Sequence, residues 1–122
     1  MNLSRVFKIE EVPIEKSTTG YMRRIVNEKT GASKIGVNIF EISPGAPSPG
    51  SHYHTKQESV GIVIEGRAKV TLEGKEYIVE PNSVIFNLPR EKHKIENIGE
   101  VPFKIIIAYS PIEDDRVEVP EE

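Results

Sequence analysis

Residues 59–79 read SVGIVIEGRAKVTLEGKEYIV, and this stretch decides the fold class. It contains three runs rich in Val and Ile, which are separated by the dipeptides Glu65-Gly66 and Glu73-Gly74. β-branched side chains lose rotamer freedom in a helix and pack well on a pleated sheet. The stretch therefore predicts three consecutive strands, and the two-residue break at 73–74 predicts a β-hairpin between the second and the third.

The same alternation of short apolar runs and turn residues continues through the rest of the chain. Further strands are predicted at 21–26, 34–42, 84–88, 93–98 and 102–109, with an edge strand at 116–119 in an otherwise solvated tail. Ile and Val number 16 and 12 against 3 Leu and 4 Ala, which argues against a helical bundle. Short strands at regular spacing in 122 residues predict one all-β sandwich or barrel.

Composition excludes several classes of function. A net charge of −3 argues against the positively charged surface that nucleic-acid binding needs, and the acidic excess lies in residues 113–122. No run of 18 apolar residues and no signal-peptide core occurs, so we expect no membrane partner and a cytoplasmic location. The absence of Cys excludes disulfides and thiolate metal sites. Many Ile, Lys and Glu with a single Gln resemble the composition of heat-adapted proteins.

The three histidines are the residues most suggestive of chemistry. His52 and His54 stand two apart, so in an extended chain both side chains point to the same side, with Cα atoms roughly 6.6 Å apart. His93 follows a Pro-containing loop at the start of another predicted strand. Each could be an ordinary surface or core histidine, but their shared placement at strand starts predicts that all three meet at one metal ion.

Two motifs resemble those of the cupin superfamily. Residues 44–66 contain Gly45, the pair His52-Tyr53-His54, Glu58 and Gly66, in the order of the first cupin motif. Residues 82–97 resemble the second motif, with Asn82, Pro89, His93 and Asn97 in order. The resemblance covers about residues 34–109, and it implies an antiparallel double-stranded β-helix, the jelly-roll or cupin barrel.

Metal ligands also follow from the resemblance, residue by residue. It implies His52, His54 and His93, with Glu58 as the fourth ligand, holding one divalent ion such as Fe, Mn, Ni or Zn. The function implied is that of a metal-dependent oxygenase, isomerase or decarboxylase acting on a small-molecule metabolite. The alternative is a non-catalytic small-molecule binding or sensor protein, since the family spans many activities. No catalytic base can be identified.

The barrel is expected at residues 34–112, with N-terminal strands at 1–33 packed on it and an acidic tail at 113–122. A homodimer is expected as well.

The sequence leaves the fourth ligand open. Strand parity counted back from Gly66 places Ser59 inward, whereas Glu58 would need a one-residue β-bulge to reach the metal. Without that bulge the site would consist of three histidines and water.

The second motif differs from the family pattern at Arg90, which stands where the motif has Gly. A non-glycine residue there predicts a loop without positive φ at that position.

Overall fold

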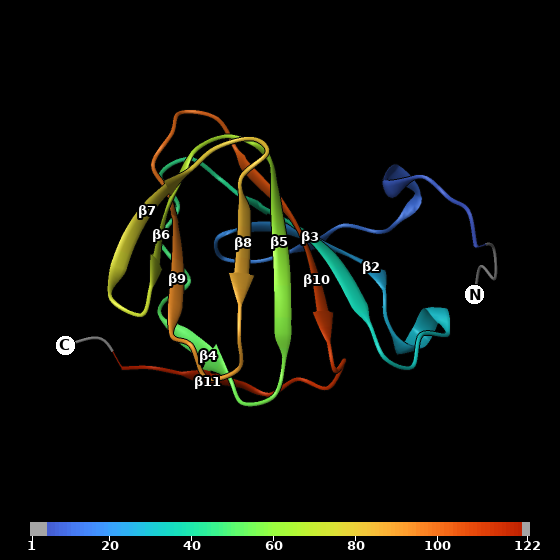
Figure 1. Cartoon of the computed structure of the whole chain (residues 1–122). Helices are drawn as coiled ribbons and strands as arrows, with labels where there is room; N and C mark the ends of the chain where they lie inside the picture. The colour runs from blue at the N-terminus through green and yellow to red at the C-terminus, as the bar shows by residue number, and fades with distance from the viewer. Residues whose placement is uncertain (1–4, 121–122) are drawn as a thin grey trace.

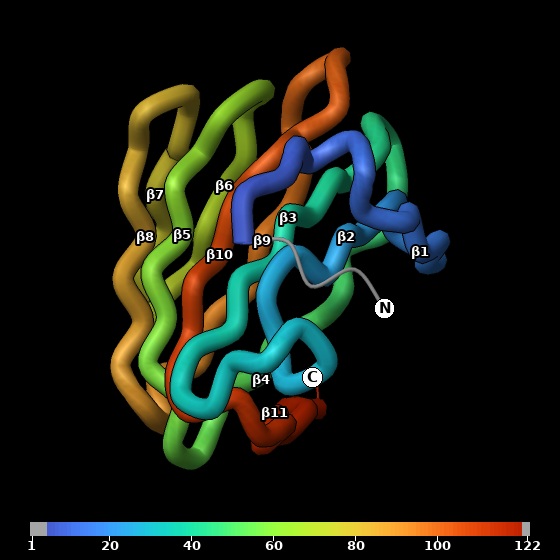
Figure 2. Tube along the Cα trace, turned by 90° about the vertical axis from the view of Figure 1, so that its right-hand side faces the viewer, coloured from blue at the N-terminus to red at the C-terminus, as the bar shows by residue number. Residues whose placement is uncertain are grey.

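The computed structural model describes residues 5–120, which form two antiparallel β-sheets facing each other (Figure 1). One sheet has six strands in the order β1-β2-β3-β10-β5-β8, and the other has five in the order β11-β4-β9-β6-β7. Figure 2 shows the strands from β8 to β2 side by side in one layer. This arrangement confirms the all-β, double-stranded β-helix expectation.

Nine of the strands lie close to predicted ones, whereas the short strands Glu15–Lys16 and His52–His54 were not predicted. Their bounds are β1 (Glu15–Lys16), β2 (Gly20–Val26), β3 (Gly36–Ile42), β4 (His52–His54), β5 (Glu58–Glu65), β6 (Ala68–Leu72), β7 (Lys75–Val79), β8 (Val84–Asn87), β9 (His93–Asn97), β10 (Phe103–Ser110) and β11 (Arg116–Glu118). The helical elements of residues 5–120 are two 3-10 turns, Ile9–Glu11 and Glu28–Thr30, and neither is long and apolar enough to span a bilayer.

The core lies between the two sheets and is built from the inward positions of alternating strands. Phe103 and Ile105 of β10 are 0% and 1% exposed, and Val63 of β5 is 1% exposed. Ala68 and Val70 of β6 meet them from the opposite sheet. Successive residues of a strand point to opposite faces, so the intervening residues of β5 and β10 face outward.

Turn geometry accounts for the hairpins. Glu73 and Gly74 both have positive φ, 49° and 82°, as the tight turn between β6 and β7 requires. Asn82 also has positive φ, 76°, which an Asn side chain tolerates. Gly66 has a φ of 84°, and a Cβ there would lie 2.6 Å from the carbonyl oxygen of Pro102, so only Gly fits this turn.

The C-terminal segment is part of the barrel wall. β11 pairs antiparallel with β4, the strand that carries two of the histidines, and both lie at the lower end of the molecule in Figure 1. The pairing sets Arg116 opposite His54 and Glu118 opposite His52. This end of the barrel therefore brings charged residues of β11 opposite two of the histidines.

Candidate metal centre

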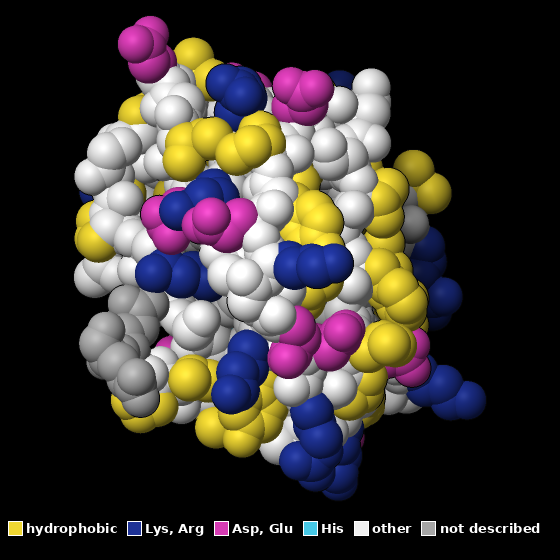
Figure 3. All heavy atoms as spheres, turned by 60° about the vertical axis from the view of Figure 1, so that its left-hand side comes forward, with side chains coloured by type: hydrophobic (Ala, Val, Ile, Leu, Met, Phe, Trp, Pro, Cys, Tyr) yellow, Lys and Arg dark blue, Asp and Glu magenta, His cyan; other side chains and the backbone are white. Residues whose placement is uncertain are grey.

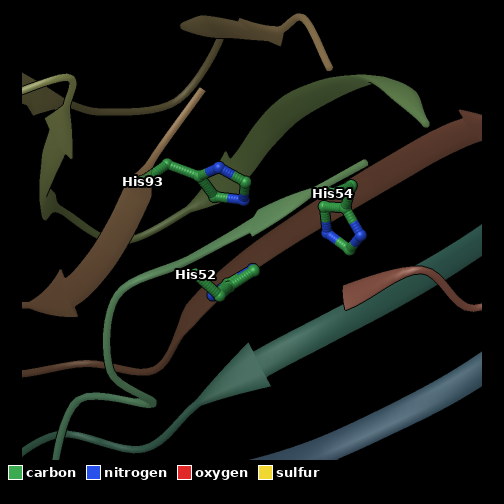
Figure 4. Close-up of side chains that lie close together, drawn as sticks. All are labelled: His52, His54 and His93. Carbon is green, nitrogen blue, oxygen red and sulfur yellow. The ribbon is translucent and has the colours of Figure 1, made fainter. Parts of the chain in front are cut away.

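All three histidines point into one space at the lower end of the barrel (Figure 4). His52 and His54 come from β4 and His93 from β9, and each offers a ring nitrogen within 4.8 Å of the others. His52 and His93 are direct cross-strand partners, with ring centroids 4.3 Å apart. The three side chains that the sequence predicted to meet are thus brought together, and they could hold a metal ion.

Backbone contacts hold the two histidine strands in place. The amide of Arg90 donates to the carbonyl oxygen of His54, which ties the loop before β9 to the end of β4. Arg90 has a φ of 69°, so the prediction of a loop without positive φ at this position is wrong. The hydrogen bond to His54 provides the physical reason, because it holds the Arg90 backbone in a conformation that a non-glycine residue rarely adopts.

Each imidazole uses its Nδ1 atom for a contact with an acceptor. Nδ1 of His52 lies 3.3 Å from the carbonyl oxygen of Gly50, and Nδ1 of His93 lies 3.0 Å from that of Glu91. Nδ1 of His54 lies 2.9 Å from the Asp115 carboxylate. A neutral imidazole that donates from Nδ1 keeps its lone pair on Nε2, which is then free to bind a metal.

Asp115 is the most heavily bonded polar side chain next to the histidines. Its second carboxylate oxygen accepts the backbone N–H groups of Lys56, at 2.5 Å, and Gln57, at 2.8 Å. Burial by itself raises the pKa of Asp115, but these bonds and the one from His54 hold that pKa below its usual value. Asp115 stays ionised and fixes the orientation of the His54 ring. Nothing in the acidic run 113–115 distinguishes this residue from its neighbours, so sequence reasoning missed it.

Burial keeps two of the rings neutral. Desolvation, with a smaller contribution from the charge of His93, lowers the pKa of His52 to about 4. Desolvation also lowers the pKa of His93, against the effect of its bond to Glu91. Both groups are therefore uncharged at neutral pH, which is the form that binds metal.

Glu58 does not join the histidines. Among the described residues, the group of potential ligands within 4.8 Å consists of the three histidines and contains no carboxylate. The pairing of β5 is regular with β10 from Glu58 to Val63 and with β8 from Ser59 to Ile62. Its register shift lies beyond Val63, so no bulge in this stretch turns Glu58 inward. Glu58 is exposed on the outward face, and Ser59 is the half-buried residue, with its hydroxyl 3.3 Å from Nδ2 of Asn87.

A family model described as "Cupin domain" matches residues 38–109, well over half of the chain. The chain belongs to the cupin family. The two sheets and the histidine positions of this cupin agree with the resemblance seen in its motifs.

The chain is also similar to individual curated proteins. This cupin is 37% identical over 69 residues to an uncharacterized protein of Methanocaldococcus jannaschii, covering 56% of the chain and 55% of that protein. It is 32% identical over 82 residues to the tetracenomycin polyketide synthase protein TcmJ of Streptomyces glaucescens, covering 67% and 54%. The chain thus spans about half the length of these two curated relatives.

A solved structure supports the fold. The chain superimposes with a TM-score of 0.79 on an uncharacterized conserved protein with a double-stranded β-helix domain from Klebsiella pneumoniae. The two are 18% identical, and the match covers 97% of this chain and 99% of that one.

The hydrogen bond between Asp115 and His54 leads to a first prediction. We expect Asp115→Asn to weaken metal affinity by about 10- to 100-fold, because outer-shell carboxylates orient ligating histidines and raise their basicity. A competition titration against a chromophoric chelator measures the change. Glu113→Gln, which removes the same charge from an exposed side chain two residues away, should leave the affinity unchanged. Equal affinities in the two variants would contradict the role given to Asp115.

Proposed function

We propose that this cupin binds one divalent first-row metal ion through Nε2 of His52, His54 and His93, and there holds a small-molecule metabolite. The observation that carries the proposal is the shared use of Nδ1: all three rings have an acceptor at that atom. Histidines that line a core by chance have no reason to leave the same nitrogen free toward the same space. Imidazole ligands suit Fe²⁺, Mn²⁺, Ni²⁺ and Zn²⁺.

The residues of the chain supply orientation and exclusion of water. The backbone carbonyls of Gly50 and Glu91 and the Asp115 carboxylate orient the three rings before any ion arrives. The inward positions of β5 beyond Ser59 are Gly61 and Val63, which present little polar surface. When bound, a divalent ion would supply Lewis acidity and open coordination positions for a ligand.

Metal-dependent turnover, as an oxygenase, isomerase or decarboxylase, is the enzymatic form of this proposal. The match to a Streptomyces protein named for polyketide synthesis supports a place in small-molecule metabolism. The alternative is a binding or sensor protein that holds its ligand without turnover. It is favoured by one observation: among the described residues no carboxylate belongs to the group of candidate ligands, and the Asp115 carboxylate bonded to His54 also accepts two backbone amides.

Elemental analysis of untagged protein tests the metal site. We expect close to one first-row metal ion per chain, and protein without stoichiometric metal after metal supplementation would contradict the site. An oxygen-uptake screen with the loaded protein then separates the two forms. Consumption of oxygen with a metabolite supports an oxygenase, whereas a ligand that binds and is recovered intact supports a sensor.

We further propose that the outward face of β5 and β8 pairs with a second copy of the chain. Val60 lies opposite Phe86, and Ile62 opposite Val84, and all four side chains are between 39% and 63% exposed. Contiguous exposed apolar surface of this kind marks an interaction site. The neighbouring Lys104 is already paired at 3.8 Å with Glu41 and with Glu65, so a second copy would bury no unpaired cation.

The outward face of the five-stranded sheet is charged, in contrast to the apolar outward face of β5 and β8. Its outward face carries ion pairs that join Lys69 to Glu76 and Glu96, and Figure 3 shows basic and acidic side chains interspersed on this side. A charged, mixed surface is typical of a face that stays in water.

Substitution of one residue on each face tests the dimer. We expect the unchanged chain to sediment as a dimer and Ile62→Glu to sediment as a monomer, because the new carboxylate would be buried without a partner. Ile78→Glu is the matched control, since Ile78 is 52% exposed on β7 of the other sheet, and it should remain dimeric. A monomeric unchanged chain, or a dimer in all three proteins, would contradict the proposed face.

A further inference from the structure

The C-terminal strand brings two charged side chains to the histidine centre. Arg116 is paired with His54 and Glu118 with His52 in the antiparallel ladder between β11 and β4. Residues directly opposite in such a ladder project to the same face of the sheet. Arg116 and Glu118 therefore share a face with His52 and His54, whereas Val117 shares the other face with Tyr53.

The electrostatic contacts agree with this placement. The charge of Arg116 contributes to lowering the pKa of both His52 and His93, after the larger effect of burial. The bond from Arg116 and, more weakly, the charge of His52 act on the pKa of Glu118, which lies below its usual value. Arg116 thus interacts with the two strands that supply the histidines, although it belongs to a segment far from them in the sequence.

Arg116 already holds a carboxylate. Its Nε donates to a carboxylate oxygen of Glu118 at 2.5 Å, and the two side chains are 37% and 65% exposed. The guanidinium is planar and presents a rigid fork of donors that matches a carboxylate. Glu118 is the more exposed of the two, so its side chain can rotate into water. The guanidinium of Arg116 is then available to another carboxylate.

The backbone of Arg116 is fixed before any ligand binds. Its amide donates to Oδ1 of Asp114 at 3.1 Å, and the adjacent Asp115 is held by His54 and by two backbone amides. A donor that is already positioned loses less entropy on binding than one on a mobile tail. The charge balance points the same way, because the single negative charge of Asp115 offsets only part of the charge of a divalent ion bound at the histidines.

We propose that Arg116 binds a carboxylate group of the small molecule held at the histidine centre, in the place that Glu118 takes in the free protein. The ligand of this cupin is then a carboxylic acid, and β11 is the element that selects it. This inference rests on the proposed function, since it places the ligand at the same centre.

Binding of simple carboxylates to the zinc-loaded protein tests the inference. Calorimetric titrations use acetate, succinate and benzoate, with the neutral succinamide as the uncharged counterpart of succinate. We expect at least one carboxylate to bind and succinamide not to bind. Arg116→Gln should weaken carboxylate binding roughly 10-fold or more, as expected for loss of a charge-assisted hydrogen bond. Glu118→Gln should strengthen it about 3-fold, because an uncharged side chain competes less well for the guanidinium.

Arg67→Gln is the matched control. Arg67 is exposed in the turn after β5, at the opposite end of the barrel from β11, so this substitution removes the same charge away from the site. It should leave carboxylate binding unchanged. Equal weakening by the two arginine substitutions would overturn the inference, because it would show only the effect of net charge.

Zinc content separates the possible failures. Zinc bound equally by the unchanged chain and by Arg116→Gln, with no carboxylate binding or with binding insensitive to Arg116, would overturn the role of Arg116 and leave the metal site intact. A chain that binds no zinc and no other divalent ion would overturn the proposed function itself.

Discussion

Protein carrying His93→Ala is expected to lose stoichiometric metal, with affinity reduced on the order of 100-fold or more, beyond the effect of losing an outer-shell partner. His93 is the one ligand that β9 contributes, and its ring faces His52 at a centroid distance of 4.3 Å. Without it, the remaining two imidazoles come from a single three-residue strand, β4. Two imidazoles from one strand coordinate the ion from one side only, so the variant lacks the ligand that β9 supplies from the other side. His52→Ala should have the same effect, and elemental analysis after dialysis measures both.

Folding must be separated from metal binding in this experiment. His93 is 7% exposed, so removal of its ring leaves a cavity that lowers the free energy of unfolding. Circular dichroism and thermal unfolding of the metal-free proteins check that the variant remains folded. Tyr53→Phe is the control, since Tyr53 lies between the two ligands of β4 and points to the other face. Retention of full metal content by both histidine variants would refute the ligand assignment.

Phe103→Ala is expected to lower the free energy of unfolding by about 3–5 kcal/mol. The Phe103 side chain is 0% exposed and belongs to the core cluster with Ile42, Val63 and Ala68. Its removal leaves a cavity in the core between the two sheets, and the lost contacts of the aromatic ring lower the stability. A loss of this size is a large fraction of the stability of a domain of this length.

Urea unfolding followed by circular dichroism measures this effect. Val101→Ala is the control, because Val101 precedes Phe103 by two residues and is 49% exposed. We expect that substitution to change the free energy of unfolding by no more than about 0.5 kcal/mol. A loss below about 1 kcal/mol for Phe103→Ala would mean that the two sheets do not pack around this side chain as the structure has them.

Local sequence signals were sufficient for most of the strands. The hairpin 68–79 has the bounds that were predicted, because β-branched runs on both sides of Glu73-Gly74 allow one register only. β5 and β10 were each misplaced by about one residue at their ends, where local sequence does not determine how far pairing extends. The sequence also predicted that the three histidines meet. The period of an extended chain puts His52 and His54 on one side, and the resemblance of the two motifs to those of cupins adds His93.

The choice between Glu58 and Ser59 needed the structure. A single bulge would have turned Glu58 inward, and bulges leave no reliable mark in one sequence. The register shift of β5 lies between Val63 and Glu65, and the ladder is regular from Glu58 to Val63, so Ser59 shares the inward face of Val63. The sign of φ at Arg90 was likewise outside the reach of sequence, because it depends on the bond from its amide to His54.

The amino-acid sequence by itself determined the all-β class, because periodicity and turn residues are local properties. The double-stranded β-helix and the full set of histidine ligands were implied by the resemblance of two motifs to those of the cupin superfamily. Only the tertiary structure decided the use of the acidic C-terminal segment, which supplies Asp115 to orient His54 and sets Arg116 and Glu118 beside the histidines. The physical reason is separation along the chain. Pairing between β4 and β11 joins residues some sixty positions apart, and no local pattern in an acidic run specifies such a partner.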